Sequence, residues 1–226
     1  WIAMVKKIKN ANQKVSIALV GKYVELHDAY LSVEESLFHA ASSLYTICDI
    51  KWIDSEEVNS ENVDCMIGDV DGVIIPGGFG IRGIEGMIEV ARYARVHNVP
   101  CFGICLGMQI MTIEYARHVL NFIDANSTEF NENTPYPVID LLHEQKNIED
   151  KGATMRLGSY PCRIEEGTLA HRLYKTTEII ERHRHRYEFN NTYLEDFEKS
   201  GLILSGSFTR KKLVEIIELP TNNYHI

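Results

Sequence analysis

Cys105 is the residue whose surroundings most clearly suggest covalent chemistry, because Gly103 and Gly107 flank it at two positions on either side. An apolar run at residues 99–104 predicts a buried strand, and residues 106–119 predict a helix. A strand that turns directly into a helix needs small residues at these flanking positions, since larger side chains would collide. Such a nucleophile elbow places the thiol at the positive end of a helix, which favours the thiolate. Taken alone, Gly-x-Cys-x-Gly is more often a buried cysteine between packing glycines.

Attack of a thiolate on a carbonyl also needs hydrogen-bond donors for the developing oxyanion. The backbone N–H of Leu106, directly after the cysteine, is one natural donor. A second donor must come from a loop whose backbone can approach closely, and residues 77–80 (Gly-Gly-Phe-Gly) follow a predicted strand at 72–76. This loop has neither the lysine nor the glycine spacing of a phosphate-binding loop. By itself, it would be interpreted as a turn.

The first half of the chain alternates strands and helices, which predicts an α/β fold with a central, mostly parallel sheet flanked by helices. Ligands of such sheets bind at the carboxyl ends of the strands, where the glycine loop and Cys105 both lie. We expect further strands at residues 14–20 and 48–53 and a surface loop or weak helix over 54–71. Asp28 is expected to cap a helix. The buried faces of the two predicted helices hold Tyr30, Val33, Leu37, Ala41 and Leu44, and Ile84, Met87, Ile88, Ala91 and Ala94.

The second half is more antiparallel in character. Residues 121–150 are rich in loop-forming residues, and residues 179–190 predict a strand that holds the densest basic cluster of the chain. If this strand is continuous, Arg182, Arg184 and Arg186 share one face. The other expected elements are a strand or hairpin at 153–164, helices at 168–174 and 191–200, and a terminal hairpin of 202–208 with 213–219.

The composition limits the class of protein. The 226 residues are 45% apolar, carry a net charge of −9 and contain five cysteines at irregular spacing. The charge argues against nucleic-acid and acidic-membrane partners, and the cysteines suit reduced thiols in the cytoplasm better than a disulfide framework or a metal site. We therefore expect a cytoplasmic protein without a membrane segment or metal. Four cysteines are interpreted as structural: Cys48, Cys65, Cys101 and Cys162.

Five motifs occur in a characteristic order and together resemble the glutamine amidotransferase domains of the CTP synthase family. They are PGGFG (76–80), GICLGMQ (103–109), ANSTEF (125–130), MRLG (155–158) and ERHRHRYE (181–188). The resemblance implies a class I glutamine amidotransferase-like fold over residues 14–226. Residues 1–13 would then be the end of a helix linking it to a preceding synthetase domain.

The resemblance also implies roles for individual residues. Cys105 would form a glutamyl thioester from L-glutamine, with Gly78 and Leu106 as oxyanion donors. Gln109 and Glu129 would contact the amino-acid end of the substrate, and Arg186 its carboxylate. Phe79, Gly107 and Met108 would complete the substrate-binding set. The charges agree with these roles, because an ammonium group pairs with a carboxylate and a carboxylate with a guanidinium.

No cofactor is expected in this domain. The resemblance implies that ammonia passes to the synthetase domain, which would use ATP and Mg²⁺ to aminate UTP to CTP with GTP as activator, in a homo-oligomer formed through that domain. The family completes its triad with a His-x-Glu pair, and residues 1–226 contain none; we expect that pair to lie beyond Ile226. The alternatives are a stand-alone γ-glutamyl hydrolase, another amidotransferase, or a catalytically inactive regulatory module.

Overall fold

The computed structural model describes residues 1–141, 155–210, 212–220 and 224–225. The chain divides into two compact units, residues 1–107 and 108–226. Within the described residues, no helix combines the length and the apolar character needed to cross a bilayer.

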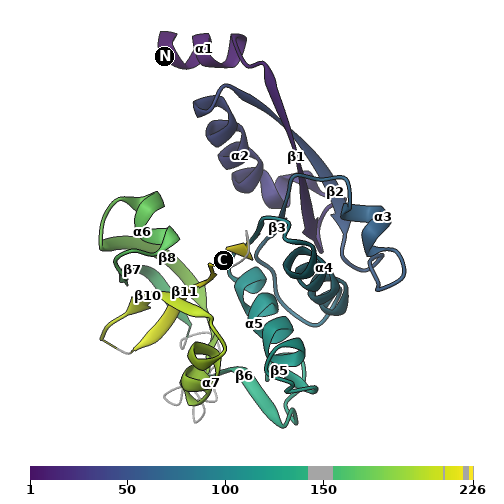
Figure 1. Cartoon of the computed structure of the whole chain (residues 1–226), viewed down its shortest axis with the longest axis vertical. Coiled ribbons are helices and arrows are strands. Elements are labelled where there is room, and N and C mark those ends of the chain that lie inside the picture. The colour runs from purple at the N-terminus through teal and green to yellow at the C-terminus, as the bar shows by residue number, and fades with distance from the viewer. Residues whose placement is uncertain (142–154, 211, 221–223, 226) are drawn as a thin grey trace. The chain divides into compact units, whose positions relative to one another are not determined.

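The first unit is built on a parallel sheet. Its strands are β1 (Gln13–Gly21), β2 (Thr46–Asp54), β3 (Gly72–Ile75) and β4 (Cys101–Gly103). They lie in the order β2-β1-β3-β4, and each neighbouring pair is parallel. The helical segments are α1 (Ile2–Lys9), η1 (His27–Tyr30), α2 (Leu31–Ser43), α3 (Val63–Ile67) and α4 (Ile84–His97), labelled in Figure 1 except for η1. The predicted strands and parallel arrangement of this half are confirmed.

Helix α4 shows how the apolar spacing produces the fold. Its five predicted inward residues are all buried: Ile84, Met87, Ile88, Ala91 and Ala94. The helix ends at Asn98, which adopts the left-handed conformation with φ 59° that often terminates helices. Arg95 and His97 lie in the last turn, where a positive charge is favourable.

Two details of the preceding helix differ from expectation. Asp28 does not cap α2, because it lies within the 3-10 turn η1 and the helix starts after Tyr30 without a side-chain cap. Leu44 is 71% exposed, since it follows the last helical turn, and Val33 and Leu37 are only partly buried where a buried face was expected. Tyr30 itself is buried against Leu19 and Val24, as the apolar spacing predicted.

The second unit is antiparallel for the most part. Helix α5 (Leu106–His118) begins two residues before the start of this unit at Met108. Neighbouring strands run in opposite directions in the order β12-β11-β10-β7-β8, and a smaller sheet has the order β5-β6-β9. The elements are β5 (Ala125–Ser127), β6 (Tyr136–Leu141), β7 (Arg156–Ile164), α6 (Leu169–Tyr174), β8 (Glu178–His185), β9 (Tyr187–Phe189), η4 (Asn191–Tyr193), α7 (Leu194–Lys199), β10 (Ile203–Phe208), β11 (Leu213–Leu219) and β12 (Tyr224–His225).

Two predictions for this unit were wrong in part. Residues 121–141 contain the strands β5 and β6 where a loop was expected, and the rest of the expected loop, 142–150, lies outside the described residues. Prolines at 135 and 137 concealed β6, whose Pro137 pairs with Asn126 of β5. The basic strand is also interrupted, because Arg186 forms a bend between β8 and β9. Residues 153–154 of the expected strand at 153–164 are likewise not described.

Candidate active site

The predicted elbow is present at Cys105. The residue lies between the end of β4 and the start of α5, with φ 55°. A left-handed conformation is uncommon for a residue with a side chain and is found where surrounding structure enforces it. Here the N–H of Ile104 donates to the carbonyl of Ile75 on the neighbouring strand, at 2.9 Å. The N–H of Gly107 donates to the carbonyl of Ile104, also at 2.9 Å, which closes the turn.

The close approach of β3 explains the glycine after the elbow. A Cβ atom at Gly107 would lie 2.1 Å from the carbonyl oxygen of Ile75, which no side chain can satisfy without a backbone shift. Gly77 meets the cysteine from the other side. A Cβ atom there would lie 3.6 Å from the Cβ and 4.0 Å from the Sγ of Cys105, so the glycine loop begins against the thiol.

The next residue of the loop lies against the first residue of α5. A Cβ atom at Gly78 would lie 3.1 Å from the Cδ2 atom of Leu106. Leu106 is buried, whereas Phe79 is exposed and Cys105 is partly exposed. The structure thus brings together five predicted residues within the first unit: Gly78, Phe79, Cys105, Leu106 and Gly107.

Lys22 is a component of this site that sequence reasoning missed. It directly follows β1, only 2% of its surface is exposed, and its Nζ atom donates to the carbonyl of Phe79 at 3.1 Å and to that of Gly80. A buried ammonium group is costly unless hydrogen bonds compensate it. Here the compensating groups are backbone carbonyls, so the lysine fixes the loop that carries Gly78. The feature of the sequence that could have indicated this role is the position of the lysine at the carboxyl end of a buried strand.

Lys22 is itself held in place. Its backbone N–H donates to the hydroxyl of Tyr30 at 3.1 Å, and burial raises the pKa of that tyrosine. Its carbonyl accepts a hydrogen bond from Arg82, which also pairs with the carboxylate of Glu56. The loop of residues 77–80 is therefore held by Lys22 at the end of β1. Arg82, which follows the loop, is bound to the same lysine.

The other predicted contacts gather in the second unit around Tyr187. The Nε2 atom of Gln109 donates to the carbonyl of Tyr187 at 3.1 Å. Burial raises the pKa of the Tyr187 hydroxyl, the charge of Glu129 raises it further, and the charge of Arg186 lowers it. Both charges are therefore close to the tyrosine. The N–H of Glu129 also donates to the Oγ atom of Ser127 at 3.1 Å, which holds the acid at the end of β5.

The basic residues of strand β8 lie on its two opposite faces. Arg182 and Arg184 are exposed, while His183 and His185 are partly buried on the other face. Arg186 does not share a face with the other two arginines, which corrects the expectation from a continuous strand, because it lies in the bend before β9. Met108, the remaining predicted residue, lies in the first turn of α5, where its carbonyl accepts a hydrogen bond of 2.9 Å from Thr112.

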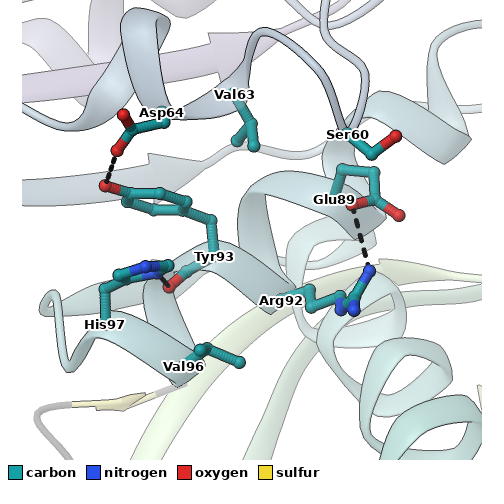
Figure 2. A pocket seen from close by; sticks show the side chains of 8 residues that line it. All are labelled: Ser60, Val63, Asp64, Glu89, Arg92, Tyr93, Val96 and His97. Carbon is teal, nitrogen blue, oxygen red and sulfur yellow. Dashed lines mark hydrogen bonds and ion pairs between the residues drawn. The ribbon is translucent and has the colours of Figure 1, made fainter.

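A pocket on the first unit, lined by residues of α3 and α4, contains none of the predicted site residues. Figure 2 shows Tyr93 pointing to Asp64 and Arg92 pointing to Glu89. The Tyr93 hydroxyl donates to Asp64 Oδ1 at 2.6 Å, which raises the pKa of the tyrosine, and Arg92 lies 3.6 Å from Glu89. These polar groups satisfy one another, and we assign them a structural role.

The other four cysteines differ in exposure. Cys101 and Cys162 are buried and Cys48 is partly buried, and burial raises the pKa of the thiols of Cys48 and Cys162. This fits inert, structural thiols. Cys65 is exposed on α3, away from any elbow. Among the described residues, no cluster of His, Cys, Asp and Glu has the arrangement of a metal site.

The chain is similar to proteins of a known family. The family described as glutamine amidotransferase class-I matches residues 25–225. The CTP synthases of Staphylococcus epidermidis and Staphylococcus aureus strain JH9 are 55% and 54% identical over all 226 residues, and the chain spans 42% of the length of each. A solved structure of the Trypanosoma brucei CTPS glutaminase domain with bound acivicin is 38% identical, with a TM-score of 0.86 over 93% of this chain and 83% of that one. The chain therefore belongs to the class-I glutamine amidotransferase family.

Proposed function

We propose that this chain is the glutaminase portion of a CTP synthase and hydrolyses L-glutamine to glutamate and ammonia through a thioester on Cys105. The observation that carries this proposal is the elbow itself. Cys105 is held at φ 55° at the start of a helix, and a Cβ atom at Gly77 of the glycine loop would lie 4.0 Å from its Sγ atom. A partly exposed cysteine in that position suits nucleophilic attack on a small amide.

In the first step, the thiolate of Cys105 attacks the side-chain amide carbon of glutamine and forms a C–S bond. The carbonyl oxygen becomes an oxyanion, for which the backbone N–H groups of Gly78 and Leu106 are the proposed donors. Collapse of this intermediate breaks the C–N bond, and the nitrogen leaves as ammonia after gaining a proton. Water then attacks the thioester, which releases glutamate and restores the thiol. We assign the proton-transferring base to no residue of 1–226.

The second set of residues suits the amino-acid end of the substrate. Glu129 provides a carboxylate for the α-ammonium group, and Arg186 provides a guanidinium for the α-carboxylate. Gln109, held through its amide by Tyr187, is the proposed polar contact beside them. Phe79, Gly107 and Met108 are the proposed walls of the glutamine site.

For the whole polypeptide, we propose that the ammonia serves a synthetase domain that aminates UTP to CTP. That domain would bind ATP and Mg²⁺, with GTP as activator, in a cytoplasmic homo-oligomer. The identity to CTP synthases over the whole chain, 55% in one case, supports this assignment. None of the residues described above is assigned to a nucleotide or a metal ion.

The test compares two activities of the complete gene product. Cys105→Ala should abolish glutamate release from glutamine, while CTP formation supported by free ammonia should persist. Arg186→Ala should raise the glutamine KM by about 10-fold to 100-fold, because a charge-assisted hydrogen bond contributes about 1.5–3 kcal/mol. Arg182→Ala, on the exposed face of β8, is the matched control. Glutamine hydrolysis that survives Cys105→Ala would refute the mechanism, and loss of both activities would point to misfolding.

A further inference from the structure

A buried ionic network lies next to the bend at Arg186, and the proposed chemistry does not use it. Its centre is Arg156, which is 6% exposed. The guanidinium pairs with the carboxylate of Glu215 through Nη2, and its Nη1 atom lies 3.6 Å from the carboxylate of Glu188. We call Arg156, His183, His185, Glu188 and Glu215 the Arg156 cluster.

Aromatic rings fix the orientation of the guanidinium. Its carbon lies 4.4 Å from the ring centre of Tyr160 and 4.9 Å from that of Phe208. Cation–π contacts of this kind are stronger when the cation is shielded from water, as it is here. A planar group held by two rings and two carboxylates has little freedom to rotate.

The two histidines complete the network without adding charge. His183 Nε2 lies 3.5 Å from Glu215, and His185 Nδ1 lies 3.9 Å from Glu188. Burial and the nearby charge of Arg156 lower the pKa of both to about 4, so both are neutral near pH 7. Arg156 is therefore the one positive charge of the cluster, and it pairs with both buried carboxylates, Glu188 and Glu215. Burial, with the charge of Glu215, accordingly raises the pKa of Glu188 to about 7, although Arg156 opposes this.

The position of the cluster relates it to the bend. Strand β8 pairs with β7, where His185 lies opposite Arg156. After Arg186 the chain enters a different sheet, in which Glu188 of β9 lies opposite Asp140 of β6. Arg156 therefore lies opposite His185, just before the bend, and also forms an ion pair with Glu188, just after it. Glu215 of β11 holds the same guanidinium from a third strand.

We propose that Arg156, Glu188 and Glu215 are positioning residues that hold the corner between β8 and β9, and so fix the direction in which Arg186 presents its guanidinium to the substrate carboxylate. This inference rests on the proposed role of Arg186. Strands β8 and β9 belong to different sheets and are joined by Arg186 alone, so the chain would otherwise be free to rotate about the backbone of the bend. The ion pairs across the corner oppose that rotation.

The test is steady-state glutaminase kinetics on the complete gene product. The assay is run at pH 8, above the pKa of about 7 of Glu188, so that Glu188→Gln keeps the shape of the side chain but removes its charge. It should raise the glutamine KM about 10-fold while kcat changes by less than about twofold, because misplacing a binding group weakens ground-state and transition-state binding alike. Glu178→Gln, an exposed carboxamide substitution at the start of β8, is the control and should change neither constant. An unchanged KM in Glu188→Gln would overturn the proposal.

A double-mutant comparison separates positioning from a general structural effect. In the Arg186→Ala background, Glu188→Gln should cause no further rise in KM, because the group that it positions is gone. Multiplicative effects would overturn the proposal. If Arg186→Ala raises KM but Glu188→Gln does not, only the positioning role fails; if Arg186→Ala is itself silent, the proposed glutamine contact fails as well. Should Glu188→Gln not fold, Arg156→Lys provides the same comparison, since lysine keeps the charge but loses the fork that reaches both carboxylates.

Discussion

The Nζ atom of Lys22 lies 3.1 Å from the carbonyl oxygen of Phe79, so a buried cation holds the loop that begins against the nucleophile. Lys22→Met should preserve the length of the side chain but release the loop. Because a correctly placed oxyanion donor contributes about 10²–10³-fold to kcat, we expect kcat for glutamine to fall by at least about 10-fold. Lys51→Met, which removes an ion pair with Asp69 on the same unit, is the control. Equal kcat values in the two variants would exclude this role for Lys22.

Two glycine substitutions should separate stability from activity. Gly107→Ala places a methyl group 2.1 Å from a backbone carbonyl, and overpacking of this kind costs about 1–3 kcal/mol of unfolding free energy. Gly77→Ala meets neighbours only at 3.6 Å or more, so it should fold normally, but its methyl group lies beside the Sγ atom of Cys105 and should slow glutamine turnover. Urea unfolding and glutamate release, measured on both variants, test this. A destabilised Gly77→Ala variant together with a Gly107→Ala variant of normal stability would contradict these predictions.

Cys105 should be the cysteine that a glutamine-like electrophile labels first. Cys105 is partly exposed at the elbow, whereas Cys101 and Cys162 are buried. Cys65 provides an internal control, because it is exposed but has no neighbouring glycine loop. A general alkylating reagent should therefore label both Cys65 and Cys105, while an electrophilic glutamine analogue should label Cys105 alone. Peptide mapping by mass spectrometry distinguishes the two patterns, and rapid analogue labelling at Cys65 would argue against a glutamine site.

The Arg156 cluster should make stability depend on pH with a maximum near 7. The pKa values of His183 and His185 fall from 6.5 to about 4 on folding, so the unfolded chain binds more protons in that range and stability decreases as the pH is lowered. The pKa of Glu188 rises from 4.5 to about 7, so its contribution decreases stability as the pH is raised through that range. Between pH 4.5 and 6.5 the two histidines outweigh the one acid, so stability should increase with pH across that range.

Urea unfolding across pH 4.5–7.5 measures this dependence. Replacing both His183 and His185 with asparagine should remove the loss at acid pH and leave only the decline caused by Glu188. His97→Asn changes an exposed histidine on α4 and should leave the profile unchanged. A wild-type profile that is flat between pH 4.5 and 6.5 would show that the cluster is not buried in its neutral-histidine form.

The elbow and its parallel sheet could be predicted because their signals are local. Strands β1 to β4 are short apolar runs, and Gly107 after Cys105 has a direct steric cause in the approach of Ile75. The role of Lys22 could not be predicted, since it depends on a carbonyl 57 residues away. The bend at Arg186 was concealed for a different reason. The alternation of residues 182–185 continues to Arg186 in the sequence, and only the pairing of β9 with a second sheet shows that the strand has ended.

The alternation along β8 also bears on how this segment can change in evolution. The two histidines of the strand belong to the Arg156 cluster, while Arg182 and Arg184 are exposed. In a library that varies each position of the strand separately, the number of residue types tolerated should alternate between low and high from one position to the next. Histidine positions should accept few replacements and arginine positions many. Sequence drift at this strand would therefore erase the basic character of the motif long before it disturbs the ionic network beneath it.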